Sequence, residues 1–259
     1  MGHHCGIGRQ RLTDIVRETV ADRIALLEMR RPPNNFFDEA LLTELADAYL
    51  ALDDEKDVTA VVLCAQGKHF CAGADLRGIG AAGIRRVYRQ AFRLFSGRKP
   101  VVAAVQGGAI GGGLGLAMSA DFRIAAPQAR LTANFARLGF HQGFALSVTL
   151  PRAVGPQRAQ DLLLTGRSVS GEEAAAIGLC DAVADDPRAA AVELAAEIAA
   201  SAPLSVPSIR ATLRRPLVAE VSAALDLEAD AQAALLDTAD FAEGIAASIG
   251  KRPPQFVGS

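Results

Sequence analysis

The stretch AIGGGLGLAMSA, Ala109 to Ala120, places three consecutive glycines before a run whose composition fits a helix. Glycine is costly to order and has no side-chain chemistry, so a glycine run indicates a backbone that another group must approach closely. The apolar segment Val101–Gln106 precedes this stretch and predicts a buried strand. We therefore expect a strand, a loop built for close approach and a helix in succession.

The same order of strand and helix recurs through the first half of the chain, and alternation of this kind predicts βαβ units with a parallel sheet. The expected strands are Val16–Val20, Arg23–Met29, Val58–Cys64 and Phe122–Ala125, and the expected helices begin at Asp38 and lie within Ala81–Ser96. From Gly143 onward the pattern is helical and strand signals almost vanish. Prolines punctuate this half and bound helices over Ala189–Ala200 and Val218–Ala239. The predicted fold class is an α/β core over residues 16–200, a helical region over 201–259 and a disordered tail over 1–15.

Composition excludes several functions. The 259 residues are half apolar, with 27 Lys and Arg against 29 Asp and Glu, so the charge balance gives no support for nucleic-acid binding. No apolar run reaches the length of a membrane span, and the polar start lacks the core of a secretory signal. The four cysteines form no CxxC pair, so we expect reduced thiols in a cytoplasm. His3, His4 and Cys5 could bind metal, but a disordered tail is the preferred interpretation, and no metal or separate cofactor is expected.

A second loop, GKHFCAGADL over Gly67–Leu76, follows the predicted strand that ends at Cys64. Both loops thus leave the carboxyl ends of neighbouring parallel strands, where open α/β sheets usually bind ligands. The amide of Ala74 and that of Gly112, at a helix start, could converge on one oxygen and form an oxyanion hole. The alternative is that the glycines mark only a tight turn or close packing. The dinucleotide pattern GxGxxG is incomplete here, which disfavours a nicotinamide-dependent oxidoreductase.

Four segments, in this order, together resemble the crotonase, or enoyl-CoA hydratase/isomerase, superfamily from about Ile24 to Gly258. They are HFCAGADL, KPVVAAVQGGAIGGGLGLAMSADFRIAAPQA, LPRAVGPQRAQDLLLTGRSVSGEEAAAIGLCDAV and EGIAASIGKRPPQFVG. The resemblance implies a spiral core of repeated ββα units and a helical trimerisation region. It also implies a homotrimer or a dimer of trimers and an acyl-CoA thioester as substrate or ligand.

The resemblance also assigns site residues. It implies that the oxyanion donors are the amides of Ala74 and Gly112, which would stabilise an enolate-like thioester oxygen. It places the backbone of Ala72, Asp75 and Leu76 along the adenine and pantetheine of CoA. Lys251 matches a basic position that approaches the CoA phosphates.

The main departure from the family concerns two catalytic glutamates, because the hydratase positions hold Gly115 and Phe135. Hydration needs one group to activate water and another to protonate the α-carbon, and neither Gly nor Phe transfers a proton. Phe135 could instead make the pocket apolar. His141 is a candidate acid or base, because an imidazole can titrate near neutral pH, or else it is a polar loop residue outside the pocket.

Three functions follow as hypotheses. The first is an acyl-CoA-processing enzyme of the lyase or isomerase class in fatty acid metabolism, with an altered acid/base set. The second is a crotonase-type decarboxylase or hydrolase, because decarboxylation needs an oxyanion hole but no general base. The third is a non-catalytic acyl-CoA binding or carrier protein.

Overall fold

The computed structural model describes residues 9–259 apart from 22, 76 and 77, and it places a seven-stranded sheet at the centre of the molecule. The strand order is β1-β2-β3-β4-β5-β7-β10, with antiparallel pairing from β1 to β3 and parallel pairing from β3 to β10. The bounds are β1 (Arg9–Arg11), β2 (Ile15–Ala21), β3 (Ile24–Met29), β4 (Ala60–Ala65), β5 (Val101–Val105), β7 (Phe122–Ala125) and β10 (Ala182–Val183). This arrangement confirms the predicted α/β class.

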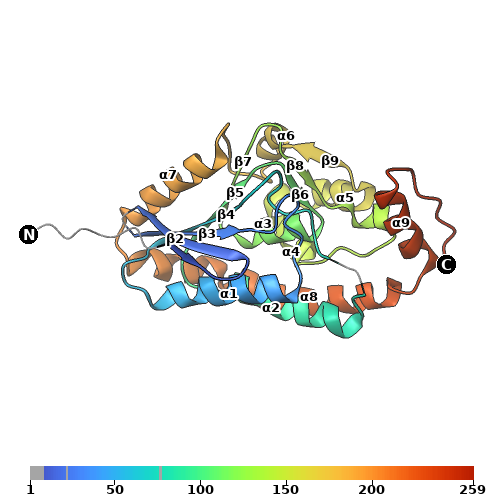
Figure 1. The fold of residues 1–259 in the computed structure, drawn as a ribbon, viewed down its shortest axis with the longest axis horizontal. Coiled ribbons are helices and arrows are strands. Elements are labelled where there is room, and N and C mark those ends of the chain that lie inside the picture. Colours follow the sequence, from blue (N-terminus) through green and yellow to red (C-terminus); the bar gives the residue numbers. More distant parts are fainter. Residues whose placement is uncertain (1–8, 22, 76–77) are drawn as a thin grey trace, which may run out of the picture.

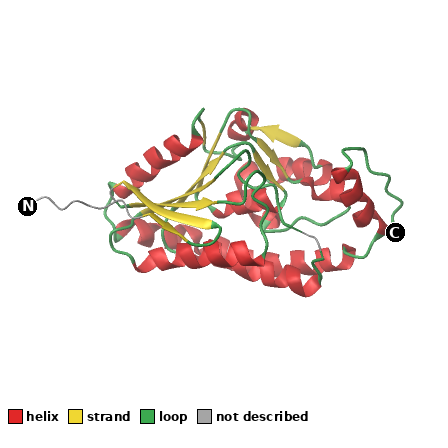
Figure 2. Cartoon of the chain, viewed as in Figure 1, coloured by secondary structure: helices red, strands yellow, loops and turns green. Residues whose placement is uncertain are grey.

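Helices cover both faces of the sheet at its centre, which explains why β4 and β5 are continuously apolar (Figures 1 and 2). On β3, Ile24 and Leu26 pack toward α7 (Pro187–Ala199), whereas Ala25 and Leu27 belong to the larger core on the opposite face. That opposite face is covered by α1 (Glu39–Ala51) and α2 (Ala81–Ser96). A strand between two helical layers has no solvent-facing side, so its positions are apolar apart from the buried Glu28 of β3, which pairs with Arg30 and Arg188.

The structure also contains a second, three-stranded sheet that the sequence does not predict. It contains β6 (Gly108–Ile110), β8 (Arg130–Thr132) and β9 (Ser168–Ser170), in the order β6-β8-β9. Each strand has three residues, too few for a periodicity to stand out in the sequence. After Gly143, where strand signals almost vanish from the sequence, the structure has two short strands, β9 and β10.

The remaining helices before α7 are short, and of these α3 and α6 each lie between a strand of one sheet and a strand of the other. They are the 3-10 helices η1 (Leu52–Asp54) and η2 (Asn134–Leu138), with α3 (Gly112–Ser119), α4 (Leu146–Val154), α5 (Pro156–Thr165) and α6 (Gly171–Ala176). The predicted order of strand, glycine loop and helix is confirmed, because α3 begins within the glycine run.

The carboxyl-terminal region is helical, as predicted, but its first helix is longer than expected. Helix α8 (Ser205–Leu235) has 31 residues and continues through Pro216, where the sequence predicted a break. An interior proline removes one helical hydrogen bond, and contacts that α8 makes with the rest of the fold override that cost. Figure 1 shows α8 running beside α2, with α9 (Ala239–Ile249) at the opposite end of the molecule from the amino terminus.

The expected amino-terminal tail is shorter than predicted. Residues 1–8 lie outside the described part, but β1 pairs with β2 and residues 12–15 are also held. Glu44 on α1 accepts hydrogen bonds from the amides of Thr13 (2.7 Å) and Ile15 (2.9 Å). The prediction of disorder over 1–15 is therefore wrong for residues 9–15, because a polar sequence can still add an edge strand.

Two expectations from composition bear on the described residues. None of the helices described here is long and apolar enough to cross a membrane. Cys64, Cys71 and Cys180 are unpaired and buried, as predicted, while Cys5 lies outside the described part.

Candidate active site

The three glycines of the loop are needed for three different reasons. Gly111 has a φ of +55°, a region that side chains disfavour. A β-carbon on Gly112 would lie 2.6 Å from Cζ of Phe37, and one on Gly113 would lie 2.1 Å from the carbonyl oxygen of Cys71. The loop is therefore packed too closely for any side chain, and the start of α3 lies directly on the preceding segment.

The amide of Ala74 faces the start of this helix. Phe37 and Ala74 form an isolated parallel bridge, in which Phe37 donates to the carbonyl of Gly73 (3.0 Å) and accepts from Asp75 (2.7 Å). Because successive amides of an extended chain point to opposite sides, the Ala74 N–H points away from Phe37. A β-carbon on Gly112 would lie 3.9 Å from this nitrogen. The amide of Gly112, first in α3, has no partner within its helix.

Both amides border one cavity of about 800 Å³, within the usual size of a small-molecule site. The segments that line it near Phe37, Ala74 and Gly112 follow β3, β4 and β5, so the cavity lies at the carboxyl ends of neighbouring parallel strands, as predicted. Its far wall comes from α8 and α9. The lining is largely apolar and includes seven aromatic residues, Phe36, Phe37, Tyr88, Phe135, Phe140, Phe144 and Phe241.

Few ionisable groups reach this cavity. Among the described residues that line it, Asp75 supplies the one carboxylate and Tyr88 the one phenol. Burial raises the pKa of the Tyr88 hydroxyl, which therefore stays protonated. Cys71, beside the glycine loop, is also no nucleophile, because burial raises the pKa of its thiol to about 12. The site is suited to hydrogen bonding and apolar contact more than to proton transfer.

Gly115 and Phe135, the positions that the family resemblance matches to hydratase glutamates, lie at or beside aromatic rings. A β-carbon on Gly115 would lie 2.4 Å from Cβ of Phe144, so no side chain fits there. Phe135 lies in η2 with its ring at the cavity, where a β-carbon on Gly111 would be 3.7 Å from its Cζ. Asn134 lines the same region, with its Oδ1 3.2 Å from that position.

The structure brings together some of the predicted site residues and not others. Ala72, Ala74, Asp75, Gly112 and Phe135 all line the cavity.

His141 does not line the cavity, and its Nδ1 is 2.7 Å from the carbonyl oxygen of Gln142. Its sequence neighbours Phe140 and Phe144 do line the cavity. Lys251 is exposed beyond the end of α9, next to the lining residues Ser248 and Ile249. Leu76 lies outside the described residues. Within the described part, no group of three or more His, Cys, Asp or Glu side chains could hold a metal ion.

Three polar side chains near the cavity were missed from the sequence. Tyr88 on α2 donates to Gln232 Oε1 (2.7 Å), and Gln232 Nε2 donates to the carbonyl of His141 (2.9 Å). Glu228, one helical turn before Gln232, is fully buried. The signal was present, since Glu228 and Gln232 interrupt the apolar stripe of α8 that includes Val221 and Leu225.

Comparison with known proteins places this fold among the crotonases. The family model for enoyl-CoA hydratase/isomerase matches residues 19–259. The probable enoyl-CoA hydratase EchA14 of Mycobacterium tuberculosis is 40% identical over 209 residues, which cover 78% of this chain and 82% of that protein. The crotonyl-CoA hydratase of Syntrophomonas wolfei is 34% identical over 252 residues, covering 91% and 95%.

A solved structure supports the same family assignment. The crystal structure of an enoyl-CoA hydratase/isomerase from Pseudoalteromonas atlantica T6c has a TM-score of 0.85 at 33% identity, and the match covers 95% of this chain and 100% of that one. The fold is thus of the crotonase class, with a helical carboxyl-terminal region. The chain belongs to the enoyl-CoA hydratase/isomerase family.

Proposed function

We propose that this protein is an acyl-CoA-processing enzyme that stabilises an enolate-like thioester oxygen between the amides of Ala74 and Gly112. The observation that carries the proposal is the approach of these two amides to each other at one apolar cavity. Two such donors, held in place before the reaction, are commonly worth a few kcal/mol each in transition-state stabilisation. The names of the relatives support a CoA thioester as the substrate class.

The CoA part is proposed to lie along the backbone of Ala72 and Asp75, with Lys251 near the phosphates. No metal and no further cofactor enters this proposal. In keeping with the family resemblance, we propose assembly as a homotrimer or a dimer of trimers.

The reaction is proposed to differ from hydration by a pair of glutamates. Gly115 has no room for a side chain beside Phe144, and Phe135 supplies an apolar ring at the other position. Water activation by a carboxylate at either position is therefore not available to this chain.

One specific reaction is favoured by these apolar walls, the decarboxylation of a malonyl-type CoA thioester. The bond between the α-carbon and the carboxylate breaks, CO₂ leaves, and the electron pair moves onto the thioester oxygen as an enolate. The two amides stabilise that charge, and the α-carbon then takes a proton from water. An apolar surrounding favours the loss of a charged carboxylate, and the step needs no general base.

The test is a panel of enoyl-, β-ketoacyl- and malonyl-type CoA thioesters, with products followed by mass spectrometry. We expect turnover of a malonyl-type substrate and no hydration of crotonyl-CoA at a rate typical of hydratases. Infrared spectra of bound acyl-CoA labelled with ¹³C at the carbonyl separate this enzyme from a carrier. A carbonyl band at lower frequency in the complex supports polarisation by the two amides. Tight binding with an unshifted band and no turnover on any substrate would instead favour a non-catalytic carrier.

A further inference from the structure

The segment that carries Phe144 has an unusual backbone. Phe144 and Ala145 both have a φ of +61°, and helix α4 begins at the next residue, Leu146. Left-handed conformations cost non-glycine residues of the order of 1–2 kcal/mol each, and two in succession are rare. A turn of this kind persists only when its surroundings hold it.

Glu228 on α8 is the group that holds this turn. Its Oε2 accepts a hydrogen bond from the amide of Ala145 (2.7 Å), and its Oε1 accepts one from the amide of Ser147 (2.9 Å). These amides belong to the start of α4, where a negative charge is favourable. Burial raises the pKa of Glu228 while the two amides oppose that rise, so the contact with the turn offsets part of the cost of burying the carboxylate.

Two neighbours hold the residues that precede this turn. The carbonyl of His141 accepts from Gln232, which in turn accepts from Tyr88. A β-carbon on Gly143 would lie 1.7 Å from the Tyr88 oxygen, so helix α2 packs directly on the backbone there. The segment from 141 to 147 is therefore fixed from α2 on one side and from α8 on the other.

The left-handed turn determines where the ring of Phe144 lies in the cavity. This ring packs edge-on against Phe37, with 5.4 Å between ring centroids, and it lines the cavity. The same side chain fills the space beside Gly115. Phe144 thus forms a rigid part of the inner wall, a few ångströms from the glycine loop.

We propose that Phe144 determines the length of the acyl group that the cavity accepts, and that Glu228 is the positioning residue that keeps Phe144 there by holding the left-handed turn. This inference rests on the proposed function, because it takes the ligand to be an acyl-CoA. The substrate class that fits is a CoA thioester, a malonyl-type one included, whose α-carbon carries a straight apolar chain that ends against the Phe37–Phe144 pair.

Calorimetric titration with saturated straight-chain acyl-CoAs of four to sixteen carbons tests the proposal. In the wild type, affinity rises by about fourfold for each buried methylene until a plateau, where the chain reaches the wall. Phe144→Ala is expected to move that plateau to longer chains, and Phe144→Leu to move it less. Glu228→Gln keeps the shape of the side chain but can accept only one of the two amide bonds through its oxygen. We expect it to move the plateau in the same direction, with no further shift in the double variant Phe144→Ala/Glu228→Gln.

The matched control is Asp226→Asn, an exposed carboxylate on the same helix, which should leave the plateau unchanged. If Glu228→Gln does not fold, Glu228→Asp, which keeps the charge and shortens the reach, is measured in its place with the same expectation. The positioning role of Glu228 is overturned if its variants lower the melting temperature and leave the plateau where it was. An unchanged plateau in Phe144→Ala overturns the role of Phe144. A wild type that binds none of the acyl-CoAs contradicts the proposed function, which is a different outcome.

Discussion

Gly115 shows how one residue can remove a chemical role from a site. Because Gly115 has no side chain, Phe144 can pack directly against α3. The space between the two residues has room for the side chain of Phe144 alone. A glutamate introduced at 115 would therefore not recreate a hydratase, because its β-carbon already overlaps with Cβ of Phe144. The absence of a side chain at Gly115 and the position of the Phe144 ring therefore depend on each other.

The first prediction concerns Gly115→Ala. The added methyl would lie 2.4 Å from Cβ of Phe144, so we expect the free energy of unfolding to fall by about 1–3 kcal/mol, the usual cost of overpacking a core. Phe144→Gly removes the opposing β-carbon and suits the positive φ at that position. In that background, Gly115→Ala should cost less, and urea unfolding of the four proteins gives the coupling. Equal costs in both backgrounds would mean that the two residues do not compete for space.

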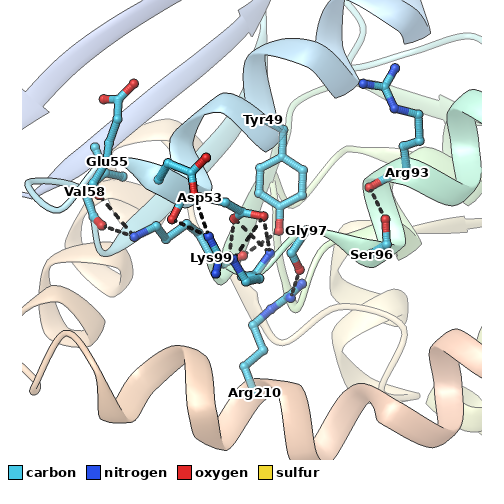
Figure 3. A network of polar contacts seen from close by, with 11 residues as sticks. Tyr49, Asp53, Glu55, Val58, Arg93, Ser96, Gly97, Lys99 and Arg210 are labelled. Atoms are coloured by element: carbon cyan, nitrogen blue, oxygen red, sulfur yellow. Dashed lines mark hydrogen bonds and ion pairs between the residues drawn. The ribbon is translucent and has the colours of Figure 1, made fainter.

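Helix α8 is attached to the core by a buried ion cluster. Asp121, just after α3, accepts hydrogen bonds from Arg210 (2.7 Å) and Arg214 (2.9 Å) on α8, and also from the amide of Val101 (2.8 Å). Figure 3 shows Arg210 reaching from α8 to the carbonyl of Gly97, next to the buried contacts of Tyr49 and Lys99. These contacts lie in the amino-terminal half of α8, which also contains Pro216, and they explain why the helix continues through that proline.

The second prediction compares two ion pairs on this helix. Asp121→Asn leaves two largely buried guanidinium groups without their counter-charge, so we expect a loss of about 3–5 kcal/mol in the free energy of unfolding. Glu220→Gln breaks the exposed pair with Arg152, and its cost should stay within about 1 kcal/mol. Chemical denaturation measures both. Similar costs for the two variants would show that the buried cluster does not anchor α8.

The third prediction concerns the segment after α9. Glu243 binds Arg252 and the amide of Gln255, and these contacts lower the pKa of its carboxyl to about 2, compared with about 4.3 in an unfolded chain. Since the folded pKa is depressed, the stabilisation is present above about pH 4.3 and is lost as the pH falls toward 2. We expect the protection of the Gln255 amide, measured by NMR as its exchange rate relative to an unstructured peptide at the same pH, to fall over this interval. Glu243→Gln should show low protection of this amide at every pH, whereas the exposed Glu197→Gln on α7 should behave as the wild type.

Much of the architecture could be predicted from the sequence, because the long elements carry strong patterns. Strand β4 reads as an unbroken apolar run since helices cover both of its faces, and α1 repeats its apolar residues at helical spacing. Strands β6, β8 and β9 could not be predicted, because three residues carry no period and their pairing is set by segments far away in the sequence. The continuation of α8 through Pro216 depends on Asp121, which lies in another part of the chain.

The site divides in the same way. The place of Ala74 and Gly112 at the cavity could be predicted, because each lies in a loop of glycine and small residues that follows a strongly patterned strand. The position of His141 could not, since the turn at Phe144 and Ala145 depends on hydrogen bonds to Glu228 from another helix. Tyr88 and Gln232 likewise become neighbours only when α2 and α8 pack together. The sequence thus predicts the residues of single loops, but it does not predict which side chains meet when distant helices pack together.

The last prediction uses the way in which the whole chain encloses the cavity. Residues 72–75 and the glycine loop form one wall, and Phe241 and Ile245 of α9 form another, so the cavity joins segments that lie far apart in the sequence. We expect free CoA to slow hydrogen exchange at the 72–75 loop, and an acyl-CoA to slow it at α9 as well. At a ligand concentration of about 100 times Kd, amides that exchange only from the open state should slow by about 100-fold. Helix α7, on the other face of the sheet, serves as the internal control and should change with neither ligand. If acyl-CoA protects α9 no more than CoA does, the acyl group does not reach α9 and the cavity is not its binding site.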